Sequence, residues 1–154
     1  MKTILRIYLC LILIVSLAII SACKIDPPYK RLSFALKRDS NNNYKLLHID
    51  VINNKIVKES PLKFRYQYIT YDSKKNRVYL SRTRGDWGFY RQIDIYDIKK
   101  QKLVKPIHTK YLGPSLVIPH GDDLVVIEEG GDQASGLYVC KYSTKGKFIN
   151  ETKL

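Results

Sequence analysis

Short runs of apolar and β-branched residues, separated by polar clusters, cover most of the chain after residue 30. In the middle of the chain these runs lie at residues 68–71, 77–82, 92–98 and 103–108. The cluster from Asp72 to Asn76 divides the first two, and Asp, Ser and Asn favour turns because their side chains bond to the nearby backbone. Runs of this length between turn clusters are typical of antiparallel strands, and no segment of this region has a helical period.

The strand pattern repeats along the chain. The paired runs 46–51 and 53–58 return 47 residues later at 93–98 and 100–105, and a third copy begins at residue 138, a further 45 residues on. The preceding strand repeats in steps of 46 residues, from Leu32 to Val78 to Leu124. The third repeat predicts strands at 116–119, 123–128, 136–142 and 147–150, whereas the first repeat lacks its first strand.

Four strands in about 46 residues match the size of a β-propeller blade. The middle repeat, residues 68–81 followed by 93–98 and 102–104, resembles a blade of the YVTN or WD40-like β-propeller class. The resemblance implies an all-β, antiparallel fold of about three four-stranded, blade-like sheets, a partial β-propeller. This domain is expected to span residues 31–154, in repeats of about 31–62, 63–110 and 111–154.

The number of repeats leaves the assembly open, because closed propellers have four to eight blades. The chain is a remnant of a longer propeller, or half of a homodimer that covers the bare sheet faces, or a compact irregular stack of sheets. A small β-sandwich-like domain that arose by duplication is the rival fold.

The first 22 residues have a different pattern. Lys2 and Arg6 precede an apolar run at 7–20, which is typical of a secretory signal helix and is shorter than the roughly 20 residues that cross a bilayer. The segment from Ile20 to Cys23 resembles the lipobox of bacterial lipoproteins, which implies cleavage after Ala22 and a lipid anchor on Cys23. Residues 1–22 are therefore expected to be a signal peptide, and residues 23–30, with two prolines, an extended tether. An ordinary secretory peptide and an uncleaved anchor are the alternatives.

The chain is strongly basic, with a formal net charge of +13. Removal of residues 1–22 takes away two of the 27 cations and none of the 14 acids, which leaves 25 − 14 = +11. Such a surface attracts anionic lipids and wall polymers, so we expect these rather than nucleic acid as partners. A basic surface that is merely solvated accounts equally well for the charge.

The connection at residues 82–91 mixes cations with aromatic residues. Arginine forks bind phosphate or carboxylate, and aromatic rings stack on sugars, bases or lipids. The simpler interpretation is that the aromatic side chains pack against the neighbouring repeat and the arginines are solvated. The candidate ligand-binding residues are Arg82, Arg84, Trp87, Tyr90 and Arg91.

Other reactive residue types lack the spacing of a known site. The acidic residues between Asp122 and Asp132 do not follow the EF-hand pattern, and we expect them to form a solvated turn or an ion-pairing surface for lysines of a neighbouring copy. The three histidines have no paired ligand spacing, and His48 is expected in the core or at its rim. Cys140, in a strand-like run, is expected to be a small buried residue.

No hydrolase, metalloprotease, nucleotide-binding or paired-cysteine motif occurs in the chain. We therefore expect a non-catalytic binding or interaction protein without a cofactor, held by lipid at the extracytoplasmic face of the cell membrane. The alternatives are a fragment of a propeller hydrolase or lyase that acts on an envelope polymer, and a degenerate remnant.

Overall fold

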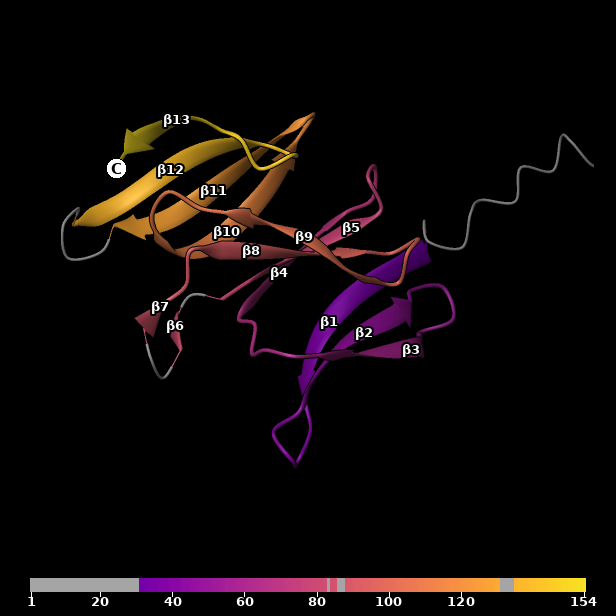
Figure 1. The fold of residues 1–154 in the computed structure, drawn as a ribbon. Coiled ribbons are helices and arrows are strands. Elements are labelled where there is room, and N and C mark those ends of the chain that lie inside the picture. The colour runs from indigo at the N-terminus through magenta and orange to yellow at the C-terminus, as the bar shows by residue number, and fades with distance from the viewer. Residues whose placement is uncertain (1–30, 83, 86–87, 131–134) are drawn as a thin grey trace, which may run out of the picture. The chain divides into compact units, whose positions relative to one another are not determined.

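The computed structural model describes residues 31–82, 84, 85, 88–130 and 135–154. The predicted signal helix at 1–22, the tether at 23–30, the lipid site Cys23 and the candidate site residue Trp87 lie outside the described residues. Within the described residues, every regular element of two or more residues is a β-strand, which confirms the all-β prediction (Figure 1). No helix in this part of the chain is long and apolar enough to cross a membrane.

Three antiparallel sheets hold the longer strands, and the strand order in each sheet follows the chain. The first sheet contains β1 (Leu32–Arg38), β2 (Tyr44–Asp50) and β3 (Lys55–Leu62). The second contains β4 (Tyr68–Asp72), β5 (Arg77–Ser81), β8 (Gln92–Asp97) and β9 (Lys102–His108). The third contains β10 (Leu112–His120), β11 (Asp123–Gly130), β12 (Gly136–Ser143) and β13 (Phe148–Lys153).

These bounds confirm the strands predicted for the second and third repeats, to within four residues at each end. The first sheet has three strands, as expected from the strand missing in the first repeat. A small hairpin of β6 (Arg84–Gly85) and β7 (Gly88–Phe89) connects β5 to β8.

The same turn chemistry recurs in three turns, one in the first sheet and two in the second. An aspartate at or near the end of a strand accepts hydrogen bonds from backbone amides in the turn: Asp50 from Ile52, Asp72 from Lys74 and Asp97 from Lys100. Four residues after each aspartate, the backbone has a positive φ, at Asn54 (47°), Asn76 (54°) and Gln101 (54°). Asparagine adopts this left-handed conformation more readily than most residues, which explains two of the three positions.

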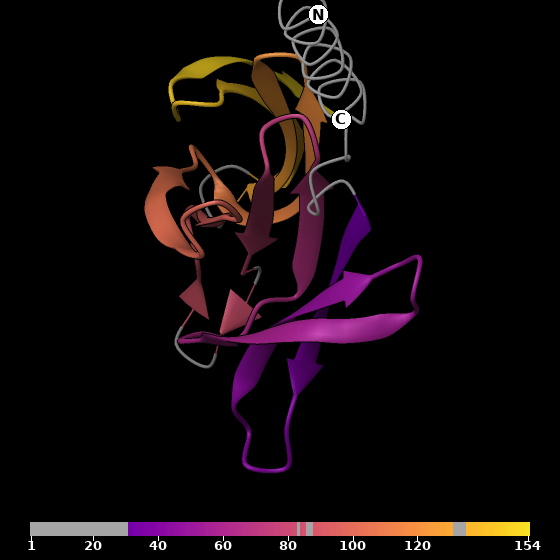
Figure 2. The ribbon, with the colours of Figure 1, turned by 90° about the vertical axis from the view of Figure 1, so that its right-hand side faces the viewer.

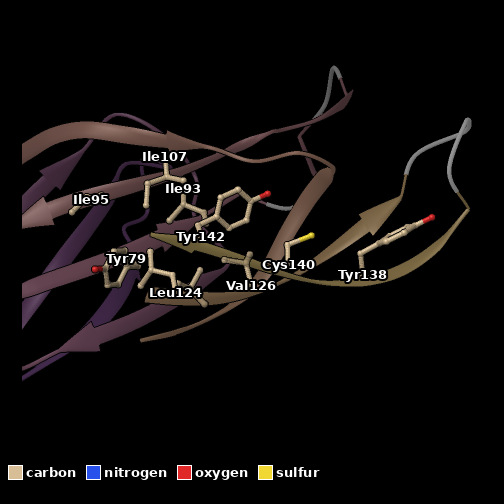
Figure 3. Close-up of a cluster of buried hydrophobic side chains, with 10 residues drawn as sticks. Tyr79, Ile93, Ile95, Ile107, Leu124, Val126, Tyr138, Cys140 and Tyr142 are labelled. Carbon is tan, nitrogen blue, oxygen red and sulfur yellow. The ribbon is translucent and has the colours of Figure 1, made fainter. Parts of the chain in front are cut away.

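The main core lies between the second and third sheets (Figure 3). Side chains alternate between the two faces of a strand, so Leu124 and Val126 of β11 are fully buried while Val125 and Ile127 are partly exposed. Burial of each large apolar side chain stabilises the fold by about 1.5–3 kcal/mol. The buried cluster contains Tyr79, Ile93, Ile95, Ile107, Val117, Leu124, Val126, Tyr138, Cys140 and Tyr142.

The second sheet also packs against the first, because β4 contacts both β1 and β10 (Figure 2). The Phe34 ring lies 4.9 Å from the Tyr71 ring. A chain of two buried side-chain hydrogen bonds also links the first two sheets, from His48 Nε2 to Ser60 Oγ (3.0 Å) and from Ser60 Oγ to Tyr96 OH (2.9 Å). Burial lowers the pKa of His48, and this core position confirms the prediction for His48.

Several turns gather at the end of the sheets where the chain enters β1, which we call the entry end. The β2–β3, β4–β5 and β8–β9 turns lie on this side, to the right in Figure 1, and the β6–β7 hairpin lies on the other. Lys75 Nζ donates to Gly121 O (2.7 Å) and so joins the β4–β5 turn to the β10–β11 turn. Lys58 donates to the side chain of Gln101 and so joins β3 to the β8–β9 turn.

Candidate functional site

The first arginine of the predicted ligand-binding loop is buried. Only 6% of Arg82 is exposed, and its Nη2 lies 3.2 Å from Asp94 Oδ2. The guanidinium carbon lies 4.0 Å from the centroid of the Phe64 ring and 4.5 Å from that of Tyr90, within the range of cation–π attraction. Tyr66 OH also donates to Asp94 Oδ2, at 2.5 Å. The charge of Arg82 is therefore matched inside the protein.

The structure brings together two of the predicted site residues, Arg82 and Tyr90. Arg91 is exposed directly before β8, whereas the side chain of Arg84 and all of Trp87 lie outside what the structure describes. The ligand-binding role of this loop stays a prediction. The sequence of the loop does not identify Asp94 as the partner of Arg82. An aspartate between Ile93 and Ile95 in an apolar strand was nevertheless a signal of a buried charge.

A groove of about 540 Å³ opens between the second sheet and the β12–β13 turn at the entry end. Ile95, Val104 and Ile107 form its apolar part. Asp97 is the one carboxylate in its lining, so the lining has five cations and one acid, or 5 − 1 = +4. The cations come from β5, from β9, from the turns that precede those strands and from the β12–β13 turn: Lys75, Arg77, Lys100, Lys105 and Lys145.

The β12–β13 turn is held close to the groove. Gly146 has a φ of +87°, and a side chain there would place its Cβ 3.4 Å from Ile107 Cγ1. A glycine permits this backbone conformation, and an added Cβ would lie in ordinary van der Waals contact with Ile107. The turn thereby brings Thr144 and Lys145 to the groove.

The lysines of the groove differ in their partners. Lys75 pairs with Asp122 Oδ1 at 3.1 Å, while the Asp97 carboxylate accepts a hydrogen bond from the Lys100 backbone amide. Among the described residues, the exposed Lys100, Lys105 and Lys145 side chains form no ion pair with an acidic side chain. Ammonium groups bind phosphate oxygens as point charges, and a threonine hydroxyl adds a neutral donor. The arrangement suits an anion with several charged oxygens.

The sequence missed this groove because its cations are spread over 71 residues, from Lys75 to Lys145, and only the packing of two sheets gathers them. The signal that could have found it was the repeat. Lysines in the β4–β5, β8–β9 and β12–β13 turns occupy one end of their sheets, since turns that join alternate strands of an antiparallel sheet share an end.

A second cluster of ionisable groups is buried in the third sheet. Glu128 is completely buried, its Oε2 accepts a hydrogen bond from the Tyr111 backbone amide (2.7 Å), and its Oε1 has no protein partner among the described residues. Burial raises the pKa of Glu128 and raises the pKa of the Cys140 thiol to about 12. A thiol with this pKa stays protonated at neutral pH, whereas nucleophilic chemistry requires the thiolate.

This environment corrects the prediction for the acidic segment. Glu128 belongs to the core rather than to a solvated turn, because it lies on the inward face of β11 with Leu124 and Val126. Asp122 and Asp123 pair with Lys75 and Lys141 of the same chain. Within the described residues, no group of three histidine, cysteine or acidic side chains has the geometry of a metal site.

No family model and no curated protein matches the chain. Among solved structures, hydrazine synthase of Kuenenia stuttgartiensis is similar, with a TM-score of 0.60 and 17% identity over 80% of this chain. The chain spans 34% of the length of that protein. The tail fiber of Staphylococcus aureus phage P68 matches over 79% of this chain and 29% of its own, with 17% identity and a TM-score of 0.38. At this identity the first likeness shows the fold alone.

Proposed function

We propose that this protein is a lipoprotein, anchored through Cys23 at the extracytoplasmic face of the cell membrane, that binds a phosphate-bearing anion in its basic groove without catalysing a reaction. The observation that supports the binding role is the gathering of five cations around one groove, of which all but Lys75 form no ion pair with an acidic side chain among the described residues. The sequence between Ile20 and Cys23 supports the anchor. We also propose that the three sheets are blades of a partial β-propeller, which the repeat length and the strand order support.

Two sources of the anion share this chemistry: the headgroups of acidic lipids and the phosphates of a wall polymer. In full-length protein, the triple change Lys100→Gln, Lys105→Gln and Lys145→Gln is expected to weaken binding of long-chain polyphosphate at least about tenfold at low salt, because charge-assisted hydrogen bonds contribute about 1.5 kcal/mol or more each. A parallel titration with phosphatidylglycerol vesicles distinguishes the lipid from the polymer.

A matched variant controls for net charge. Lys63→Gln, Lys74→Gln and Lys102→Gln remove the same charge from exposed positions outside the groove lining. Their effect is expected to be roughly two- to threefold, through long-range attraction that salt screens. Equal losses in the two triple variants would show that only net charge matters. A larger loss from Arg84→Gln with Arg91→Gln would move the site to the loop at residues 82–91.

The anchor has its own test. Lipid attachment requires the thiol of Cys23, so Cys23→Ala should abolish acyl labelling and block the lipoprotein-specific cleavage. A Cys23→Ala protein that still partitions into detergent with a labelled acyl chain contradicts the anchor.

A further inference from the structure

The β2–β3 hairpin exposes four large aliphatic side chains at one tip. Val51 is 56% exposed, Ile52 62%, Ile56 51% and Val57 48%. Single exposed aliphatic residues are ordinary on protein surfaces, but a contiguous group marks a contact with another apolar phase. Lys55 lies between the two pairs of aliphatic residues in sequence.

The hairpin tip lies where the chain enters the domain. The Val51 backbone amide donates to the Arg31 carbonyl at 3.0 Å, and Arg31 directly precedes β1. Only residues 24–30 separate Arg31 from Cys23 in sequence. Even at full extension this connection spans about 28 Å, so a lipid on Cys23 limits how far the tip can lie from the bilayer.

The surroundings of the tip are basic. Lys58 follows on β3 and donates to Gln101 of the β8–β9 turn, which also carries Lys100 of the groove. Asp50, which directly precedes Val51, turns its carboxylate toward the turn itself, where Oδ1 accepts from the Ile52 amide (3.0 Å) and Oδ2 from the Asn53 side chain (2.7 Å). Apolar side chains flanked by lysines are the composition of segments that lie at the surface of an anionic bilayer.

We propose that the β2–β3 tip is a membrane-contact site. Val51, Ile52, Ile56 and Val57 enter the boundary between headgroups and acyl chains of an anionic bilayer, and Lys55 and Lys58 pair with lipid phosphates. This inference rests on the lipid anchor of the proposed function, because the short tether supplies the argument for a bilayer rather than a protein partner. The contact would hold the entry end, and the basic groove with it, at the membrane surface.

The test uses lipidated full-length protein in vesicles of phosphatidylglycerol and phosphatidylcholine. A single tryptophan is placed by Ile52→Trp or by Leu137→Trp, each combined with Trp87→Phe. Leu137 is a matched control because it is 46% exposed and lies near the start of β12, at the end of the sheets opposite the entry end. Phospholipids brominated high on their acyl chains should quench at least half of the tryptophan emission of the Ile52→Trp protein and leave that of the Leu137→Trp protein nearly unchanged.

Flotation of the same vesicles separates the contact from the anchor. If the Ile52→Trp protein floats but is quenched no more than the Leu137→Trp protein, the membrane contact is overturned and the anchor stands. If adding Cys23→Ala to the Ile52→Trp protein changes neither its flotation nor its quenching, the anchor is overturned and the contact stands. If the Ile52→Trp protein is not quenched but Ile52→Asp changes the sedimentation of the protein, the tip binds a protein partner and the proposal is wrong.

Discussion

Two buried acidic side chains, Asp94 and Glu128, compensate for their loss of water in different ways. Asp94 accepts hydrogen bonds from Arg82, Tyr66 and Gln92 and stays paired with a charge. Glu128 has no cation beside it and keeps one oxygen without a protein partner in the described structure, so its neutral form is favoured. The two residues therefore respond differently to substitution.

Removal of the cation from the first pair should be strongly destabilising. Arg82→Met leaves the Asp94 carboxylate buried without its counter-ion, which costs about 3–5 kcal/mol of unfolding free energy in such pairs. Urea unfolding measures the loss. Adding Asp94→Leu should recover part of it, and Arg91→Met, at an exposed position, should stay within about 0.5 kcal/mol. A loss from Arg82→Met as small as that from Arg91→Met would contradict a stabilising role for the buried pair.

Glu128 should make stability depend on pH. Its folded-state pKa is raised above the ordinary value of 4.5, so its contribution is fully present below that pH and is lost as the pH rises through the folded-state pKa. Glu128→Gln should therefore increase the thermal midpoint relative to the parent at pH 8 and change it little at pH 4. Glu129→Gln, at the exposed neighbouring position, should leave the slope unaltered. A pH-independent difference between Glu128→Gln and the parent would exclude titration of this carboxyl.

At the scale of elements, the turns show how local sequence and strand pairing agree. The aspartate at a strand end fixes the turn, and the residue four positions later takes the left-handed conformation that lets the next strand return. Gln101 takes the position that Asn54 and Asn76 take in the other two turns, and asparagine adopts the left-handed conformation more readily than glutamine. The left-handed backbone is therefore less favourable at Gln101 than at Asn54.

Reciprocal changes at this position test that account. Asn54→Gln should lower the unfolding free energy by about 0.5 kcal/mol, and Gln101→Asn should raise it by a smaller amount, because the shorter side chain also loses the exposed hydrogen bond from Lys58. Gly146→Ala should cost about 1 kcal/mol or more, since φ is +87°, a conformation that residues with a Cβ rarely adopt. Chemical denaturation of the three variants supplies the values. Gains or losses in the same direction for Gln101→Asn and Asn54→Gln would argue against a common turn requirement.

At the scale of the whole domain, the two outer sheet faces differ. Across the outer face of the first sheet, Glu59 pairs with Lys37 (3.2 Å) and Lys45 (2.8 Å). The outer face of the third sheet exposes Leu116 and Ile118 of β10 and Leu137 of β12, together with one ion pair between Asp123 and Lys141 (2.8 Å). The three exposed leucine and isoleucine side chains make the third face better suited than the first to contact with a second copy. A face of four strands and eight residues covers about 500 Å², so two such faces bury about 1,000 Å², at the lower limit of specific interfaces.

We therefore expect weak, reversible dimers through the third sheet. Ile118→Lys with Leu137→Lys should shift sedimentation equilibrium to the monomer, whereas Lys37→Ala with Lys45→Ala should not weaken the association. A cooperative monomer at every concentration would contradict this arrangement and favour a self-contained β-domain.

The sequence alone determined the strands and their grouping. Apolar alternation and turn residues are local properties, so β4, β5, β8 and β9 could be located from the residues themselves. The 46-residue period further indicated three sheets and the strand absent from the first. The burial of His48 and Cys140 also followed from their places in the repeat.

Tertiary structure alone decided which charged side chains are buried and which lie close to one another. Arg82 and Glu128 look like surface residues in the sequence, because their partners and the side chains that cover them come from other strands. The groove likewise combines residues that are far apart in the chain, and a hydrogen bond joins the hairpin tip to Arg31 at the start of the domain. The physical reason is that desolvation and electrostatic potential depend on all neighbours in space, whereas a sequence pattern records only the neighbours along the chain.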